Sequence, residues 1–103
     1  MIVVSVTYPN SDGAKFDFDY FREKHMPLVR SLLSDSGLQD IKALRGVAAP
    51  GGGPATNQAV SLLSFASLDG FQSGIAKHGA AIFADRPNFT DIKPLFQINE
   101  PIG

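Results

Sequence analysis

The amino-acid sequence predicts an α+β fold of the ferredoxin-like type, in which two helices cover one face of a four-stranded antiparallel sheet. Strand-like and helix-like stretches follow one another in the order β-α-β-β-α-β. The chain has 103 residues, which suffice for one modest hydrophobic core but not for two. The predicted elements need no long connection that lacks structure of its own. We therefore expect a single domain over residues 1–103.

The first half of the chain predicts a strand followed by a long helix. The β-branched and aromatic stretch Ile2–Tyr8 is typical of a strand. Asp17 can cap a helix whose C-terminal end suits Gly37. Pro27 lies inside this pattern and removes a backbone hydrogen bond, so we expect a kink near Lys24–Pro27. The apolar residues at helical spacing are Phe18, Phe21, Leu28, Val29 and Leu32.

The second half predicts three strands and another helix. Strands are expected over Ile41–Ala49 and Ala59–Ala66, separated by the Gly- and Pro-rich loop Pro50–Pro54. Ser67 can cap a helix from Leu68 to about Ala84, although three glycines weaken it by up to about 1 kcal/mol each. Apolar Phe71, Ile75 and Ile82 lie on one face of this helix. Arg86–Thr90 breaks the helical pattern, and a last strand spans Leu95–Asn99.

Composition excludes several classes of partner. Hydrophobic residues make up 44% and charged residues 18% of the chain, a globular balance. Nine basic against ten acidic residues give a net charge of −1 without a basic stripe, which argues against nucleic acid. No apolar run reaches about 18 residues, so no membrane span is expected. The N-terminus lacks the positive region of a signal peptide, and we expect a cytoplasmic protein.

The face of the predicted sheet that no helix covers is not cleanly polar. In the third strand Val60 and Leu62 point one way, while Leu63 and Phe65 point the other way. An exposed apolar patch of this size is rare in monomers, so we expect a homodimer that packs sheet to sheet about a two-fold axis. The alternative is a misread alternation, because a shift of one residue would exchange the two faces.

His25 is the most informative residue for chemistry. It lies at the centre of the apolar stripe of the first helix, where desolvation lowers the pKa of its imidazole. A neutral imidazole with a free nitrogen is a competent general base. The alternative is a core histidine whose nitrogens are satisfied by backbone groups or by Tyr8. His78, at the rim of the second helix's stripe, is expected to be half-buried.

The remaining polar motifs predict structure rather than chemistry. The early carboxylates favour a helix N-terminus, and no metal-ligand spacing is present, so we expect no metal site. Gly51–Gly53 lacks the following Lys and Ser or Thr of a phosphate loop and is interpreted as a flexible loop. Cysteine is absent, which excludes disulfides and thiolate ligands.

Four segments of the sequence resemble the EthD family. They are Tyr8–Asn10, Phe16–Phe21, His25–Val29 and Ala84–Asp91, in order along nearly the whole chain. The resemblance implies a ferredoxin-like protomer, a dimeric α+β barrel formed through the sheets, and a pocket between sheet and helices in each protomer. Arg86 stands where we expect an apolar residue in many relatives.

The resemblance also implies two kinds of function. The EthD family is named for a protein encoded beside a cytochrome system that degrades fuel ethers, and many members are called reductases. Its superfamily includes cofactor-free isomerases, polyketide cyclases and monooxygenases. We expect a small apolar or aromatic ligand and no tightly bound cofactor. In the first hypothesis, an isomerase-, cyclase- or oxidoreductase-type enzyme uses His25 as general base and Tyr8 as hydrogen-bond donor.

The second hypothesis is a non-catalytic binding or accessory protein for an oxygenase or a degradation pathway. A third is a scaffold whose filled core leaves no pocket near His25. For a ligand site, the expected substrate-binding residues are Phe21, Leu28, Phe65, His78 and Phe83.

Overall fold

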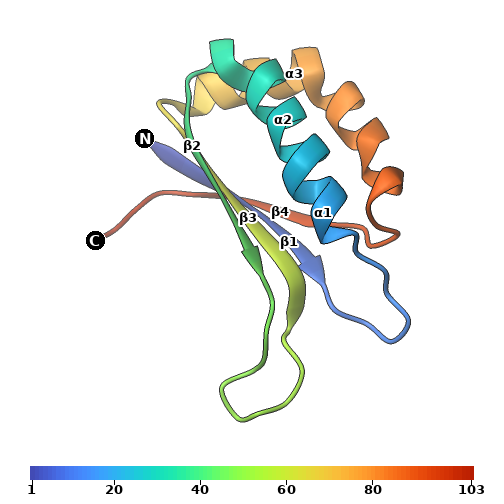
Figure 1. Cartoon of the computed structure of the whole chain (residues 1–103). Coiled ribbons are helices and arrows are strands. Elements are labelled where there is room, and N and C mark those ends of the chain that lie inside the picture. Colours follow the sequence, from blue (N-terminus) through green and yellow to red (C-terminus); the bar gives the residue numbers. More distant parts are fainter.

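A computed structural model describes residues 1–103 and confirms the ferredoxin-like α+β fold (Figure 1). The strands are β1 (Ile2–Pro9), β2 (Leu38–Arg45), β3 (Asn57–Phe65) and β4 (Leu95–Asn99). They form one antiparallel sheet in the order β2-β3-β1-β4, with all helices on one face. No helix combines the length and the hydropathy that crossing a bilayer requires.

The second strand is displaced from the expected Ile41–Ala49. Gly37 adopts a φ of 82°, a left-handed conformation that glycine tolerates, and the chain enters β2 directly after it. β2 then pairs with β3 from Leu38 opposite Phe65 to Arg45 opposite Ala59. The pairing of β2 with β3, rather than the β propensity of its residues, therefore sets both ends of β2. For the same reason β3 begins two residues earlier than expected and ends one residue earlier.

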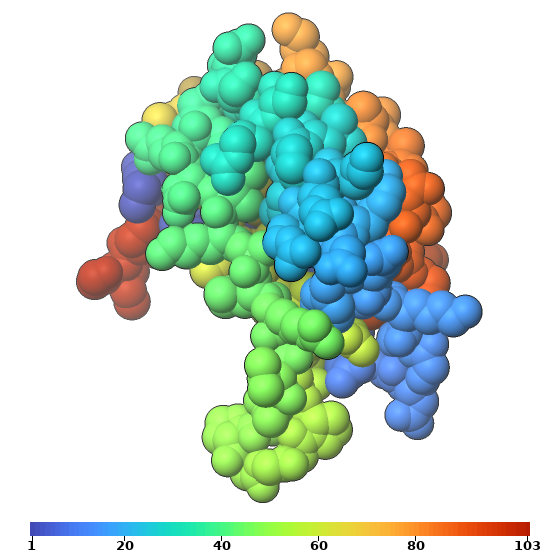
Figure 2. Space-filling view, viewed as in Figure 1, coloured from blue at the N-terminus to red at the C-terminus, as the bar shows by residue number.

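The segment that joins β2 to β3 has no regular structure, as its glycines and prolines predict. It includes Gly51–Gly53, and none of these three glycines would bring an added Cβ within 4 Å of another atom. The loop projects from the main body of the protein (Figure 2).

The first helical segment is not one kinked α-helix but a succession of helix types. They are α1 (Phe18–Tyr20), the π-helix η1 (Phe21–His25), α2 (Met26–Leu33) and the 3-10 turn η2 (Ser34–Ser36). Asp17 caps the start as predicted, because its Oδ1 accepts a hydrogen bond from the Tyr20 amide at 3.0 Å.

The π-helix explains how the helix accommodates Pro27. Proline has no N–H to donate, and its ring crowds the carbonyl of the preceding turn. The Met26 amide donates to the carbonyl of Phe21, a bond that spans one residue more than in an α-helix. The expected irregularity is thus present, slightly earlier than predicted. Phe21 and His25, at either end of η1, are both buried.

The last helix, α3, spans Leu68–Asp85 and continues into the 3-10 turn η3 (Arg86–Asn88). Ser67 caps α3 as predicted, with its Oγ 3.1 Å from the Gly70 amide. The glycines that weaken this helix permit close packing. A Cβ at Gly74 would lie 2.4 Å from the Ser36 Oγ, and a Cβ at Gly70 would lie 2.5 Å from the Ser36 carbonyl oxygen.

The two faces of the sheet alternate as the sequence predicts. The inner face, beneath the helices, is buried over β1 and β3, at Val4, Val6, Tyr8, Ala59, Ser61, Leu63 and Phe65. The outer face mixes apolar, polar and charged residues, at Val3, Ser5, Thr7, Asp40, Lys42, Leu44, Val60, Leu62, Ser64, Leu95, Gln97 and Asn99. Two of its leucines are largely exposed in the single chain, Leu44 at 52% and Leu95 at 63%.

Candidate functional site

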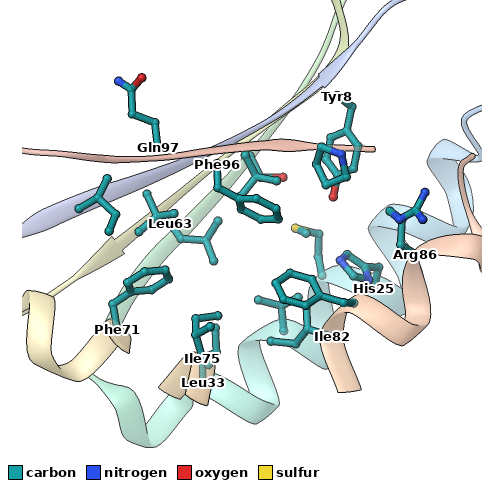
Figure 3. Close-up of a pocket in the computed structure, with 18 residues that line it drawn as sticks. Tyr8, His25, Leu33, Leu63, Phe71, Ile75, Ile82, Arg86, Phe96 and Gln97 are labelled. Atoms are coloured by element: carbon teal, nitrogen blue, oxygen red, sulfur yellow. The ribbon is translucent and has the colours of Figure 1, made fainter. Parts of the chain in front are cut away.

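A cavity of about 570 Å³ lies between the inner face of the sheet and the helices (Figure 3). Its volume is in the range of small-molecule sites, about 300–1,000 Å³. Its apolar lining consists of Val4, Val6, Met26, Val29, Leu33, Leu63, Phe71, Ile75, Ile82, Phe83, Pro94, Phe96 and Ile98. Among the polar residues at its boundary, Gln97 points away from it. The remaining polar residues are Tyr8, His25, Ser61 and Arg86.

Two residues of the cavity lining, Phe83 of α3 and Phe96 of β4, lie partly at the protein surface. The two rings form an edge-to-face contact, with ring centroids 5.5 Å apart. Both side chains remain about half exposed.

His25, the last residue of η1, lies against a wall of aromatic rings. Only 5% of the residue is exposed. Its ring centroid is 4.4 Å from that of Phe89 and 5.6 Å from that of Phe21. Burial lowers the pKa of His25 below its ordinary value of 6.5, and the nearby Asp85 offsets this only in part. His25 is therefore neutral near pH 7, as its place in the apolar stripe predicts.

The hydrogen-bond partner of His25 is Asp85, the last residue of α3. The Asp85 Oδ2 lies 2.9 Å from the His25 Nδ1. The other carboxylate oxygen, Oδ1, accepts one hydrogen bond from the Tyr20 hydroxyl at 2.6 Å and another from the side-chain amide of Asn88 at 2.9 Å. Burial raises the pKa of the Asp85 carboxyl, but these three hydrogen bonds outweigh burial and hold the pKa below its ordinary value. Asp85 therefore stays ionised.

The ionised carboxylate fixes the tautomer of the imidazole. A carboxylate only accepts hydrogen bonds, so the proton of the neutral ring resides on Nδ1. Nε2 then carries a lone pair. This is the arrangement that a general base requires, and the same carboxylate stabilises the imidazolium that forms when Nε2 takes a proton.

Tyr8 and Arg86 supply hydrogen-bond donors at the same end of the cavity as His25 (Figure 3). Burial raises the pKa of Tyr8 to about 12, although the positive charge of Arg86 opposes the shift. The Tyr8 hydroxyl thus remains a neutral donor. Arg86 Nη1 donates to the Ile92 carbonyl at 3.0 Å, which anchors one nitrogen of the guanidinium.

Ser61, in the middle of β3, places an unpaired hydroxyl on the floor of the cavity. The residue is 2% exposed, and its Oγ has no hydrogen-bond partner in the protein. A buried hydroxyl without a partner costs about 1–3 kcal/mol. Such a group in a cavity wall is suited to a hydrogen bond with a ligand.

We predict that Ser61→Ala raises the free energy of unfolding of the ligand-free protein by about 1 kcal/mol, because it removes that desolvation cost. Urea denaturation of both proteins measures the difference. The matched control is Ser64→Ala on the outer face of the same strand, which should change stability by less than about 0.5 kcal/mol. A destabilised Ser61→Ala protein would show that the hydroxyl supports the fold instead.

Among the residues expected from the sequence to form the site, Tyr8, His25 and Phe83 line the cavity. The others lie outside its lining. Phe21 stacks on the imidazole ring of His25 but does not itself line the cavity. Phe65 is fully buried in the core against Phe71, at 5.1 Å between ring centroids.

The last two expected residues are Leu28 on α2 and His78 on α3. Both are half-buried, and neither lines the cavity. His78 therefore lies where the sequence places it, at the edge of the apolar stripe of α3, but away from the polar end of the site.

Sequence reasoning missed Asp85, Ser61 and the place of Arg86 in the cavity. Ser61 carried a signal, because it alternates in phase with buried Leu63 and Phe65 and is polar where the pattern calls for an apolar residue. Asp85 lies in the EthD-like segment Ala84–Asp91, but nothing local indicated that it pairs with His25, because 60 residues separate the two. The open alternative for His25 named backbone groups or Tyr8 as partners, and the structure corrects this to Asp85.

Fold and site together define a small ferredoxin-like α+β protein with a ligand-sized apolar cavity and a buried histidine–aspartate pair. A family model described as the EthD domain matches residues 13–93. The chain belongs to the EthD family, as its sequence motifs indicated.

Solved structures of similar proteins agree with this assignment. An EthD-like protein from Ralstonia eutropha is 35% identical, with a TM-score of 0.92 over 99% of this chain and 92% of the other. An ethyl tert-butyl ether D (EthD) family protein from Bacillus halodurans is 22% identical, with a TM-score of 0.76 over 99% of both chains. SnoaB, a cofactor-independent oxygenase from Streptomyces nogalater, shares the fold at 12% identity, with a TM-score of 0.66 over 99% of this chain and 92% of the other. No protein of curated function matches the chain.

Proposed function

We propose that the cavity is an active site in which His25 acts as a general base on a small apolar or aromatic molecule. The observation that carries the proposal is the 2.9 Å hydrogen bond between His25 Nδ1 and the ionised Asp85. This bond holds a neutral imidazole in the tautomer that leaves Nε2 unprotonated. Proton transfer by an imidazole uses a free nitrogen of this kind and a carboxylate that stabilises the imidazolium.

The reaction would begin at a C–H bond next to a carbonyl group. The lone pair of His25 Nε2 takes the proton, and the electrons of the broken C–H bond move onto the carbonyl oxygen. The Tyr8 hydroxyl donates a hydrogen bond to that oxygen as it gains negative charge. The imidazolium then returns the proton to the same or another carbon. An isomerase or a cyclase of this kind would need no bound cofactor for the proton transfer.

The direct test is exchange of carbon-bound hydrogen with solvent deuterium. We expect the purified protein in D₂O to exchange the acidic protons of a bulky aromatic ketone such as 2-tetralone, and of lactones or quinones of similar size. Proton NMR follows the loss of signal. Imidazole at the same concentration serves as the control, since it offers the same base without the cavity. The proposal fails if the protein accelerates exchange of no compound beyond that control.

The apolar lining also favours a second candidate, a non-catalytic protein that holds a hydrophobic metabolite for an oxygenase or a degradation pathway. This candidate predicts saturable binding of the same compounds without exchange. Binding measured by quenching of tyrosine fluorescence, together with unchanged NMR signals in D₂O, would favour it over the general-base function.

We further propose that two copies of the chain associate through their outer sheet faces. Val60 and Leu62 lie at the centre of this face, and the exposed Leu44 and Leu95 lie toward its edges. A second copy is a natural cover, because a two-fold axis brings the same patch of each chain together. The cavity lies on the opposite side of the sheet, so each copy would hold its own site.

A further inference from the structure

We infer that the cavity takes an apolar molecule with a single negative charge, whose carboxylate is bound by Arg86. The inference rests on the proposed function in taking this cavity as the substrate site, and it narrows the substrate class to hydrophobic monoanions. Its combination with the carbonyl chemistry above points to aromatic or alicyclic keto acids.

The first reason is that Arg86 has no anionic partner in the protein. The ion pairs of the structure join Arg22 to Asp19 and to Glu23, and neither includes Arg86. Asp85 precedes Arg86 in sequence, but its carboxylate is taken up by His25, Tyr20 and Asn88.

A cation at the wall of an apolar cavity is costly unless it is paired. Arg86 is half-buried there, and the carbonyl of Ile92 is the one hydrogen-bond acceptor of its guanidinium in the protein. An anionic ligand would supply the missing charge. A neutral ligand of the same shape would instead displace water from the guanidinium and leave its positive charge without a counter-charge.

The second reason is that the guanidinium is already positioned for a ligand. Its bond to the Ile92 carbonyl uses Nη1 and leaves other N–H donors available. The guanidinium fork matches the two oxygens of a carboxylate. Tyr8 and His25 lie at the same end of the cavity (Figure 3), so a carboxylate on Arg86 would place a neighbouring carbonyl near both groups.

The third reason is that the rest of the cavity rejects further charge. Beyond the His25 end, the lining is aliphatic and aromatic, with Leu33, Leu63, Phe71 and Ile75 at the far end (Figure 3). Ser61 adds one neutral hydroxyl on the floor. With no second free cation in the lining, a phosphate or dicarboxylate would bury uncompensated charge. The cavity therefore suits an apolar ligand that carries a single carboxylate.

A matched pair of ligands tests the charge directly. We expect the wild-type protein to bind 2-naphthoic acid at least tenfold more tightly than 2-naphthamide, which has the same shape without the charge. Titration calorimetry at pH 8, where His25 is neutral, measures both dissociation constants. In Arg86→Gln the preference for the acid should disappear, while the affinity for the amide changes by less than about threefold. Arg86→Lys should keep a reduced preference, since it keeps the charge and loses the fork.

Arg30→Gln is the matched control, because Arg30 is exposed on α2 and its loss changes net charge equally. It should leave the preference unchanged. The inference is overturned if the wild-type protein binds acid and amide equally, or if Arg86→Gln keeps the preference. If Arg86→Gln does not fold, the ratio of the two dissociation constants in the wild-type protein and in Arg86→Lys still tests the inference.

The binding assay is independent of turnover, so the two proposals can fail separately. A preference for the acid without deuterium exchange would retain the anion site and reject the general base. Exchange of neutral ketones without a preference for the acid would retain the base and reject the anion site.

Discussion

Replacing His25 by Ala should lower the rate of deuterium exchange by about 10²–10⁴-fold, the usual contribution of a positioned general base. The variant removes the only imidazole that lines the cavity. The pH dependence supplies a second signature. Because burial holds the pKa of His25 below 6.5, exchange by the wild-type protein should persist below that pH and fall only as the buried ring becomes protonated. Proton NMR rates between about pH 4 and pH 8 measure both effects.

Asp85→Asn separates a positioned base from a histidine that only fills the core. An Asn amide can donate to Nδ1, which would move the ring proton to Nε2 and block the base. Exchange should therefore fall although His25 is retained. The pKa of His25 should also fall further, because the charge and hydrogen bond of Asp85 both raise it in the wild-type protein. Asp35→Asn, at an exposed position of η2, is the matched control.

The outcome depends on folding being intact, which circular dichroism and the unfolding midpoint establish for each variant. Wild-type exchange rates in folded His25→Ala would reject His25 as the base. If Asp85→Asn were folded and kept both the rate and the His25 titration, Asp85 would have no positioning role. His78→Gln simplifies that titration, since the chain has only two histidines.

Leu62→Glu should convert the proposed dimer to monomers. Leu62 lies on a central strand, opposite Ser5 of β1 and Lys42 of β2, on the face away from the cavity. Burying a carboxylate in this interface is costly even beside Lys42, and the two-fold axis places the new charge in the interface twice. The dissociation constant should thus rise by more than about 100-fold. Sedimentation velocity should give the wild-type protein twice the chain's 11.0 kDa and the variant a single chain mass.

Gln72→Glu, on the exposed side of α3, adds the same charge away from the sheet and should leave the dimer intact. A wild-type protein that sediments as a monomer at micromolar concentration would reject association through this face. A Leu62→Glu protein that remains a dimer would move the interface elsewhere, and the unfolding midpoint would distinguish that result from a general loss of structure.

The fold was largely predictable because its signals are local. Alternating side chains in β1 and β3 and the helical spacing around His25 each depend on neighbours within a few residues. The caps Asp17 and Ser67 are local for the same reason. The burial of His25 and its neutral state followed from the apolar stripe alone.

Features that join distant segments were not predictable in this way. The ends of β2 depend on its pairing with β3, and local propensity placed them wrongly. The partner of His25 is a carboxylate at the end of another helix, brought near by the packing of α3 against α2. That Ser61 has no hydrogen-bond partner and Arg86 no carboxylate partner is likewise a property of their three-dimensional surroundings.

The sequence by itself thus determined the order of elements, the family, the two faces of the sheet and a buried neutral imidazole. Only the tertiary structure decided that this imidazole has an ionised partner, and that Tyr8, Ser61 and Arg86 share one cavity with it. The physical reason is the distance along the chain over which each kind of interaction acts. Periodicity and capping act over single turns and strands, whereas a site is made by side chains that are close in space but separated along the chain.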